Sequence, residues 1–310
     1  MLTGIHFLLT YSCTNECDHC FLYCSPNAKG TFTLSRLGEA LRETAKVASV
    51  KCVYFEGGEP FLFYPLMLEG IRLARDLGLK TGVVTNCYWA TSVEDAVLWL
   101  TPLRELGVAD LSLSDDAFHH GQDEDNPAKW ALAAARELDF PVDTICIAQS
   151  ATGEQTDGTG AKGEPVTGGN VMYRGRAVEK LTAGLPIAPW ERFIECPHED
   201  LEGPQRVHVD PFGNVHLCQG LSMGNMWEIP LSELVAKYNP HAHPICGPLI
   251  RGGPAELARH HGITPTEGYV DECHLCWEVR KALIDRFPQY LAPKQVYGIA
   301  QELLTKRRQV

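Results

Sequence analysis

The chain has 310 residues, 45% of them hydrophobic, and a formal net charge of −12. This length can form a large core in one α/β domain, or in one large and one small domain. An acidic chain whose one basic stretch is the short tail at 305–310, predicted to be a solvated terminus, is not expected to bind nucleic acid. No apolar run reaches the ~18 residues that span a bilayer, and residues 1–10 lack a signal-peptide pattern. The sequence therefore predicts a cytoplasmic protein without a membrane partner.

Short β-rich runs and amphipathic segments alternate over the first half of the chain. Strands are predicted at 5–10, 51–56, 79–86, 110–115 and 141–149, and helices at 34–47, 66–78, 93–106 and 128–139. Strands joined by helical crossovers form a parallel sheet. We therefore expect an α/β protein whose sheet is open or curled into part of a (β/α) barrel, with ligands at the carboxyl ends of the strands.

The second half has a different pattern. Residues 151–170 are rich in Gly and Thr and predict a long surface loop, followed by a helix at 172–181. Residues 206–218 predict a hairpin around an Asp-Pro-Phe-Gly-Asn turn, and further helices are expected at 230–238, 270–287 and 293–306. The change places a domain boundary near residue 190, dividing the chain into 1–190 and 191–310.

Twelve cysteines in a reducing cytosol indicate metal binding or catalysis rather than disulfides. Cys13, Cys17 and Cys20 follow the first predicted strand, and thiolates at this spacing suit an iron–sulfur cluster or zinc. Three ligands would leave one metal position open. The rival interpretation adds Cys24 as a fourth ligand, because Cys17, Cys20 and Cys24 partly match the ferredoxin pattern.

A second motif, GGEP, follows the predicted strand at 51–56. Gly57 and Gly58 would let the backbone come close to a ligand. The adjoining Glu59, followed by Pro60, would offer an exposed carboxylate that can accept hydrogen bonds from an ammonium group. By itself the motif is also compatible with an ordinary turn.

Together, CxxxCxxC and GGEP resemble the motifs of the radical S-adenosylmethionine (SAM) enzymes. The resemblance implies a partial (β/α)6 TIM-like barrel in which Cys13, Cys17 and Cys20 hold a [4Fe–4S] cluster. The amine and carboxylate of SAM would then chelate the open iron. It also implies that the segment Gly57, Gly58, Glu59 and Pro60 binds the SAM amino group, and that His19 lies against the adenine.

Other candidates for cofactor contacts lie near later strand ends. The resemblance makes Thr85, Asn86, Ser112, Ser114 and Asp116 candidates for the methionyl or ribose parts of SAM, although polar residues at strand ends are common. Arg174 and Arg176 could clamp a carboxylate or phosphate of SAM or substrate, or begin a surface helix. Asp115, His119 and His120 are either substrate contacts or solvated loop residues, and Ile145 and Ile147 either pack in the core or contact adenine.

Five cysteines in the second half form another set: Cys196, Cys218, Cys246, Cys273 and Cys276. Their arrangement resembles the C-terminal SPASM or twitch domains of radical SAM enzymes, and five cysteines favour the smaller α+β, one-cluster version. The expected ligands are Cys196, Cys218, Cys273 and Cys276, with Cys246 as a substitute for Cys196 and zinc as the alternative to an auxiliary [4Fe–4S] cluster. Cys52, Cys87 and Cys146 are expected to behave as small apolar residues.

The resemblance also implies a reaction. An electron donor such as flavodoxin or ferredoxin would reduce the cluster, and SAM would be cleaved to a 5′-deoxyadenosyl radical that abstracts hydrogen from a small-molecule or peptide substrate. Twelve residues precede Cys13, so no N-terminal peptide-recognition domain is expected, which favours a small molecule. The alternative from a different class is a non-catalytic iron–sulfur electron-transfer protein.

Overall fold

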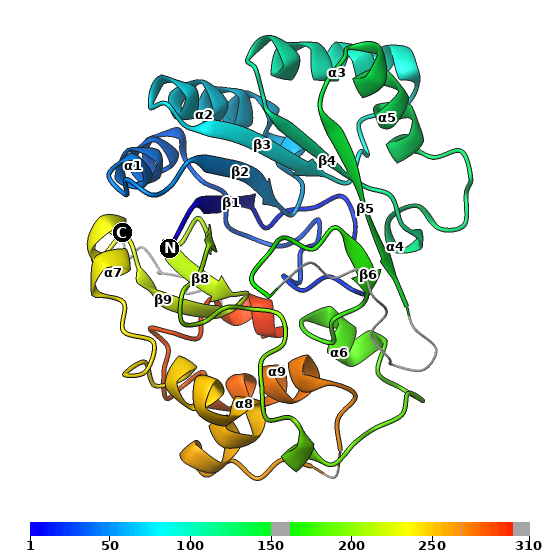
Figure 1. Ribbon diagram of the computed structural model, residues 1–310. Helices are drawn as coiled ribbons and strands as arrows, with labels where there is room; N and C mark the ends of the chain where they lie inside the picture. Colours follow the sequence, from blue (N-terminus) through cyan, green and yellow to red (C-terminus); the bar gives the residue numbers. More distant parts are fainter. Residues whose placement is uncertain (150–161, 267, 300–310) are drawn as a thin grey trace, which may run out of the picture.

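The structure is a computed structural model that describes residues 1–149, 162–266 and 268–299. One sheet organises these residues, with the strand order β6-β5-β4-β3-β2-β1-β7-β8-β9 (Figure 1). Its strands are β1 (Gly4–Thr10), β2 (Cys52–Gly57), β3 (Lys80–Thr85), β4 (Asp110–Ser114), β5 (Val142–Ala148), β6 (Gly168–Asn170), β7 (Arg206–Val209), β8 (Asn214–Cys218) and β9 (Leu221–Asn225). In Figure 1 the sheet curves from β6 round to β9, as a partial barrel does.

Strands β1 to β6 pair in parallel and in chain order, which confirms the predicted α/β class. Helices connect them: α1 (Leu34–Ala45), α2 (Tyr64–Asp76), α3 (Val93–Glu105), α4 (Ala117–His120) and α5 (Pro127–Glu137). The longer helices begin where the sequence supplies a cap, because the side chains of Thr33, Ser92 and Asn126 each accept a hydrogen bond from a first-turn backbone N–H. The elements predicted over the first half are confirmed to within a few residues.

The two faces of the central strands differ in chemistry. Side chains alternate along a strand, so Ile5, Phe7 and Phe55 pack with α1 and α2 in the main hydrophobic core. Leu8 belongs to a second buried cluster, which contains Cys13, Leu22 and Cys24 and lies beneath the loop that follows β1. The side of the sheet opposite the helices therefore faces the cysteine loop.

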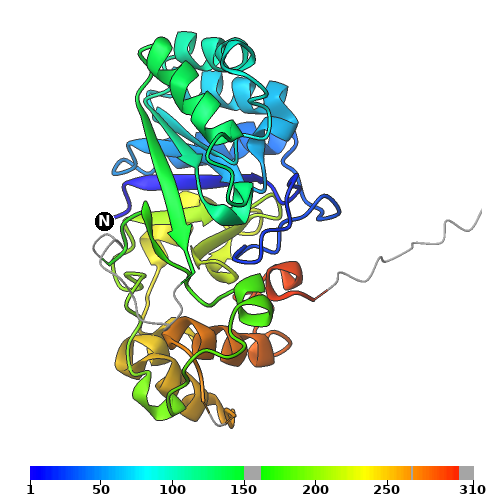
Figure 2. The ribbon, with the colours of Figure 1, turned by 90° about the vertical axis from the view of Figure 1, so that its right-hand side faces the viewer.

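The second half continues the same sheet. Strand β7 pairs in parallel with β1, and β8 and β9 follow in antiparallel order. The predicted hairpin is confirmed, and β9 is a further strand. The helices after the hairpin are α7 (Leu231–Lys237), α8 (Cys246–His261) and α9 (Glu272–Leu283). Figures 1 and 2 show α8 and α9 at the end of the molecule opposite α3 and α5. The boundary near residue 190 stays a prediction.

The helices of the second half differ from the predictions. The sequence did not predict α8, because Gly252, Gly253 and Pro254 interrupt it and the two glycines have non-helical dihedrals. The helix expected at 172–181 is reduced to α6 (Arg176–Lys180), because Gly175, at φ +63°, packs its backbone against Cys20 and Phe21.

The start of the helix expected at 293–306 is a 3₁₀ turn, Lys294–Tyr297, which ends at Gly298 with φ +69°. Residues 300–306, the tail at 305–310 and residues 150–161 of the predicted surface loop lie outside the described residues. Within the described part of the chain, no helix has both the length and the apolar character needed to cross a membrane.

Candidate functional site

The first cysteine cluster lies on the loop between β1 and α1, beyond the carboxyl end of β1. Cys13 is buried, and Cys17 and Cys20 are half-buried. Backbone hydrogen bonds fold the loop back on itself, from Cys13 N to Ser25 O (3.0 Å) and from Cys20 N to Cys17 O (3.0 Å). The structure thus brings the three predicted thiols together on one ordered loop.

Cys24 differs from these three residues in its role. It is buried, and its backbone N–H donates to Cys20 Sγ (3.4 Å). Hydrogen bonding from Cys24 lowers the pKa of the Cys20 thiol to about 6. The pKa of Cys24 itself is raised, first by its hydrogen bond with Cys20 and then by burial. Cys24 therefore stays protonated and supports a thiolate at Cys20 as a donor.

Gly57 and Gly58 join the end of β2 to the cysteine loop. Gly58 N donates to Thr10 O (2.7 Å), and Glu59 N donates to Ser12 O (2.9 Å). A Cβ on Gly58 would lie 2.1 Å from Ser12 O, and a Cβ on Gly57 would lie 2.5 Å from Thr10 O. The group that comes close to these two glycines is therefore the backbone of the cysteine loop itself.

Glu59 is fully buried, so the expectation of an exposed carboxylate is wrong. Its Oε1 accepts hydrogen bonds from Phe61 N (3.0 Å) and Thr85 Oγ1 (2.9 Å), and its Oε2 accepts one from Asn86 N (2.8 Å). Burial raises the pKa of Glu59 to about 7. The carboxylate fastens the end of β2 to the end of β3, while Pro60 begins the 3₁₀ turn Pro60–Phe63.

Asn86 extends this network to the first cysteine. Its Nδ2 donates to Thr14 Oγ1 (3.0 Å) and lies 3.5 Å from Cys13 Sγ. Thr85 accepts a hydrogen bond from Trp89 Nε1 (3.0 Å) and donates to Glu59. The two predicted strand-end residues therefore meet the cysteine loop and the GGEP segment at one point.

The end of β4 brings a further polar group beside the loop. Asp116 Oδ1 lies 2.8 Å from His119 Nδ1, and Asp116 Oδ2 accepts a hydrogen bond from Ile147 N (3.3 Å). The His19 ring packs on Phe118 with centroids 4.4 Å apart. Its Nδ1 is buried without a hydrogen-bond partner, and burial lowers the pKa of His19 to about 4.

A cavity of about 390 Å³ opens between the cysteine loop and α4. Its lining comprises Asn15, Glu16, Cys17, Asp18, Ala117, Phe118 and His119. Of the two predicted serines, Ser114 ends β4, and its carbonyl lies 2.9 Å from His120 Nε2. Ser112 lies deeper in the strand, with its hydroxyl 3.4 Å from Asp110 Oδ2. The cavity is therefore bordered by the cysteine loop on one side and by the residues after β4 on the other.

Arg176 begins α6, but it is not at the surface. It is buried, and its guanidinium donates to Cys17 O (2.7 Å) and Cys24 O (2.8 Å). Its backbone N–H donates to Cys20 O (2.9 Å). Arg176 thus holds the cysteine loop in place from the start of α6.

The second cysteine set also converges. Cys196 precedes β7, Cys218 ends β8, and Cys273 and Cys276 lie in the first turns of α9. Burial raises the pKa of Cys196 to about 12, with further contributions from Cys276 and Cys218. The pKa of Cys273 is also raised, first by burial and further by the nearby Asp271, Cys196 and Cys218, so these thiols are neighbours in the fold.

Buried cationic groups surround this set. Arg174 Nη1 lies 3.2 Å from Cys218 Sγ and 3.3 Å from Glu199 Oε1, and the fully buried Arg280 donates to Gln219 O (3.0 Å). Four buried polar atoms here have no hydrogen-bond partner: Arg174 Nε, Gln219 Oε1, Trp277 Nε1 and Arg280 Nε. Three of these atoms, the nitrogens, are donors, and unpaired buried donors are costly, so the surroundings fit an anionic group at the thiols. Cys246 is fully buried at the start of α8.

The three remaining cysteines differ in exposure. Cys87 is buried and Cys52 is half-buried, whereas Cys146 is exposed on β5. The residues of β5 are all either exposed or half-buried. Ile147 packs against the small cluster that contains Val171 and Tyr173.

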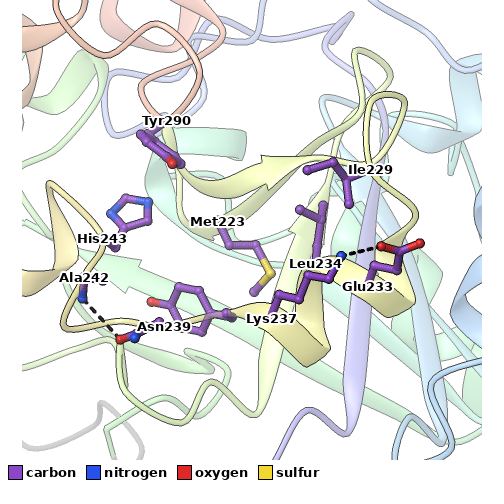
Figure 3. Close-up of a pocket in the computed structure, with 10 residues that line it drawn as sticks. Met223, Ile229, Glu233, Leu234, Lys237, Asn239, Ala242, His243 and Tyr290 are labelled. Carbon is purple, nitrogen blue, oxygen red and sulfur yellow. Dashed lines mark hydrogen bonds and ion pairs between the residues drawn. The ribbon is translucent and has the colours of Figure 1, made fainter.

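A smaller cavity, of about 210 Å³, lies between β9, α7 and Tyr290 (Figure 3). Its lining contains no cysteine, and polar groups at its edge already have partners. Lys237 Nζ pairs with Glu233 Oε2 (2.7 Å), and Asn239 Oδ1 accepts from Ala242 N (3.2 Å). We assign it no role.

Fold and site together define an α/β protein with a three-cysteine loop at the carboxyl end of a parallel sheet. Residues 7–154 match the family model of the radical SAM superfamily, and they form a radical SAM domain. Proteins of this superfamily bind a [4Fe–4S] cluster and SAM. The resemblance of the second half to a SPASM or twitch domain remains a proposal.

Two curated relatives share part of this domain. YydG of Bacillus subtilis (strain 168), named as a peptide biosynthesis protein, is 26% identical over 107 residues, 34% of each chain. An S-adenosylmethionine-dependent nucleotide dehydratase of Pseudoalteromonas ulvae is 28% identical over 105 residues, 29% of this chain and 34% of that protein. The matches thus span about a third of either relative.

Among solved structures, BtrN in complex with AdoMet and 2-DOIA has a TM-score of 0.49 at 14% identity, covering 76% of this chain and 82% of BtrN. anSMEcpe with bound AdoMet also has a TM-score of 0.49, at 13% identity, covering 93% and 98% of the two chains.

Proposed function

We propose that this protein is a radical SAM enzyme in which Cys13, Cys17 and Cys20 hold the [4Fe–4S] cluster and leave one iron to SAM. The observation that carries the proposal is the role of Cys24. A fourth cysteine is available on the same loop, yet it lies buried as a hydrogen-bond donor to Cys20. Three thiols with a supporting fourth favour an open cluster over the fully ligated cluster of an electron carrier.

When bound, the cluster and SAM supply a 5′-deoxyadenosyl radical that abstracts a substrate hydrogen. The chain's own residues bind and orient these groups. The Gly57–Glu59 backbone and Asn86 form the wall next to Cys13. His19 offers an unpartnered ring nitrogen beside the cavity between the loop and α4, where an adenine could stack. The buried network centred on Glu59 keeps water out of the strand ends.

The proposal extends to an auxiliary [4Fe–4S] cluster on Cys196, Cys218, Cys273 and Cys276. Two buried arginines, Arg174 and Arg280, lie among these thiols, and they would offset the negative charge of a four-thiolate cluster. Cys246, buried at the start of α8, is the substitute for Cys196.

The reaction would take a small molecule or a peptide, with a donor such as flavodoxin or ferredoxin providing electrons. The names of the relatives support both substrate classes, one referring to peptide biosynthesis and the other to a nucleotide. Their matches cover about a third of each relative, so the choice between the two classes stays open in this proposal.

The test is formation of 5′-deoxyadenosine by anaerobically reconstituted, dithionite-reduced protein with SAM. We expect the wild type and Cys24→Ala to form it and Cys20→Ala to form none, with Cys24→Ala keeping the N-terminal cluster. A wild type that carries its cluster but forms no 5′-deoxyadenosine would instead be an electron carrier. Iron analysis tests the second site, since two cubanes give about eight irons per chain, whereas one cubane and zinc give about four.

A further inference from the structure

Three ionisable side chains meet on neighbouring strands, away from both cysteine sets. They are His6 of β1, Glu56 of β2 and His208 of β7. His6 pairs in register with His208, and Glu56 pairs with Leu8. Their sequence neighbours Phe7, Phe55 and Val209 all belong to the main core on the helix side of the sheet. Because side chains alternate along strands, the three polar groups share the opposite face.

Their donor atoms lie at the spacing of a coordination sphere. Glu56 Oε2 is 3.0 Å from His6 Nδ1, and Glu56 Oε1 is 3.1 Å from His208 Nε2. One donor atom from each residue fits within a 4.8 Å group. An ion with ligand bonds of about 2.1 Å separates neighbouring donors by roughly 3.0 to 3.4 Å. Each of the two His–Glu distances, one to each carboxylate oxygen, matches that donor-to-donor spacing.

The donor types also suit a cation. His6 and His208 each turn a ring nitrogen toward the Glu56 carboxylate, so the three side chains already face one another. Metal ligands must be deprotonated, and one carboxylate with two imidazoles is a common donor set for divalent first-row metals. The His6 ring is also held flat against Tyr54, with centroids 4.6 Å apart.

The place of the group in the fold separates it from the cofactor site. Leu8 lies two residues along β1, about 7 Å nearer the cysteine loop, and packs with Cys13 and Cys24. The three residues therefore lie deeper on the same face of the sheet, beneath the loop and not part of it.

We propose that His6, Glu56 and His208 bind one divalent first-row transition-metal ion inside the curve of the sheet. Three protein ligands leave coordination positions open, as in catalytic metal sites. The coordination would be completed by water, or by an oxygen or nitrogen group of a substrate that enters from the cluster side. This site does not depend on the radical SAM proposal.

The test uses reconstituted holoprotein, stripped with EDTA and titrated with MnCl2. Mn²⁺ suits carboxylate and imidazole better than thiolate, and its free form is counted by electron paramagnetic resonance. We expect one tight Mn²⁺ per chain, displaced by Zn²⁺, with binding weakened at least about tenfold by Glu56→Gln or His208→Asn. Spin-echo modulation of the bound ion should show coupling to imidazole nitrogen.

Two matched variants serve as controls for the metal titration. His119→Asn removes a member of the other His-Asp-His group, at the cofactor cavity, and should leave the tight Mn²⁺ site intact. His216→Asn removes a buried histidine of β8 that pairs in register with His208 but bonds to Asp210, and it should also leave the site intact. Wild type without a tight site, loss of that site in His119→Asn, or bound Mn²⁺ without nitrogen coupling would overturn the proposal. The 5′-deoxyadenosine assay can fail while Mn²⁺ still binds, so the two proposals fail separately.

Discussion

At the scale of single residues, side chains from other elements hold the cysteine loop in place. Arg176 spans from α6 to two carbonyls of that loop, and Asn86 connects it to the GGEP segment. The sequence predicts both as ligand contacts, and that stays a prediction. Their buried hydrogen bonds give them a positioning role for the loop as well.

Arg176→Ala should lower the free energy of unfolding by about 2 to 4 kcal/mol, because two buried carbonyls lose a charged donor. Cluster loss on exposure to air should also become faster. Urea unfolding and the decay of cluster absorbance measure these effects. The control is Arg72→Ala, which removes an exposed pair with Glu69 and should change stability by less than about 1 kcal/mol. Equal effects in the two variants would contradict the role given to Arg176.

At the scale of elements, the end of β2 and the loop after β1 act as one unit. Their contact is backbone to backbone, through Gly57 and Gly58, so the side-chain types around it matter less than the absence of a Cβ. The carboxylate of Glu59 then joins this unit to β3. Three successive strand ends are thus fixed relative to one another before any cofactor binds.

Gly58→Ala should push β2 away from the cysteine loop, because its Cβ would lie 2.1 Å from Ser12 O, a backbone atom that cannot rotate aside. We expect a loss of about 1 to 3 kcal/mol of stability and a reduced iron content after reconstitution. Gly203→Ala is the matched control, since its nearest contact is an ordinary 3.4 Å to Asp200 Oδ2. Normal iron loading in Gly58→Ala would show that the loop tolerates displacement.

At the scale of the whole molecule, buried histidines lie both on the sheet and outside it. Burial lowers the pKa of His208 and of His243 to about 4, from a usual value of 6.5. The unfolded chain therefore binds more protons than the folded chain between those two pH values. These two histidines therefore contribute a loss of stability as the pH decreases through this window.

We expect the free energy of unfolding of the holoprotein to decrease steadily from pH 6.5 toward pH 5. His243→Gln should reduce that slope, near the lower end of the range, by the amount that corresponds to about one bound proton. Anaerobic urea titrations followed by tryptophan fluorescence give the slope. His260→Gln, at an exposed histidine, should leave it unchanged. A slope that His243→Gln does not alter would mean that other groups dominate the acid response.

The sequence by itself determined the alternating strands and helices of the first half, the hairpin, and both groups of cysteines. These follow from local periodicity and from spacing along the chain. It missed α8, whose internal glycines and proline hide a helix held by its neighbours, and it did not show that Glu59 and Arg176 are buried. The set of His6, Glu56 and His208 also escaped notice, because a histidine in an apolar strand resembles an ordinary core residue.

Only the tertiary structure decided how these residues meet. Contacts between segments up to about two hundred residues apart, such as His6 with His208, set the register that places β7 beside β1. Side-chain burial and the donor role of Cys24 likewise depend on the folded structure. Spacing along a chain constrains local geometry, whereas burial and pairing depend on which distant strands lie side by side. The motifs could therefore be read from the sequence, but their surroundings required the fold.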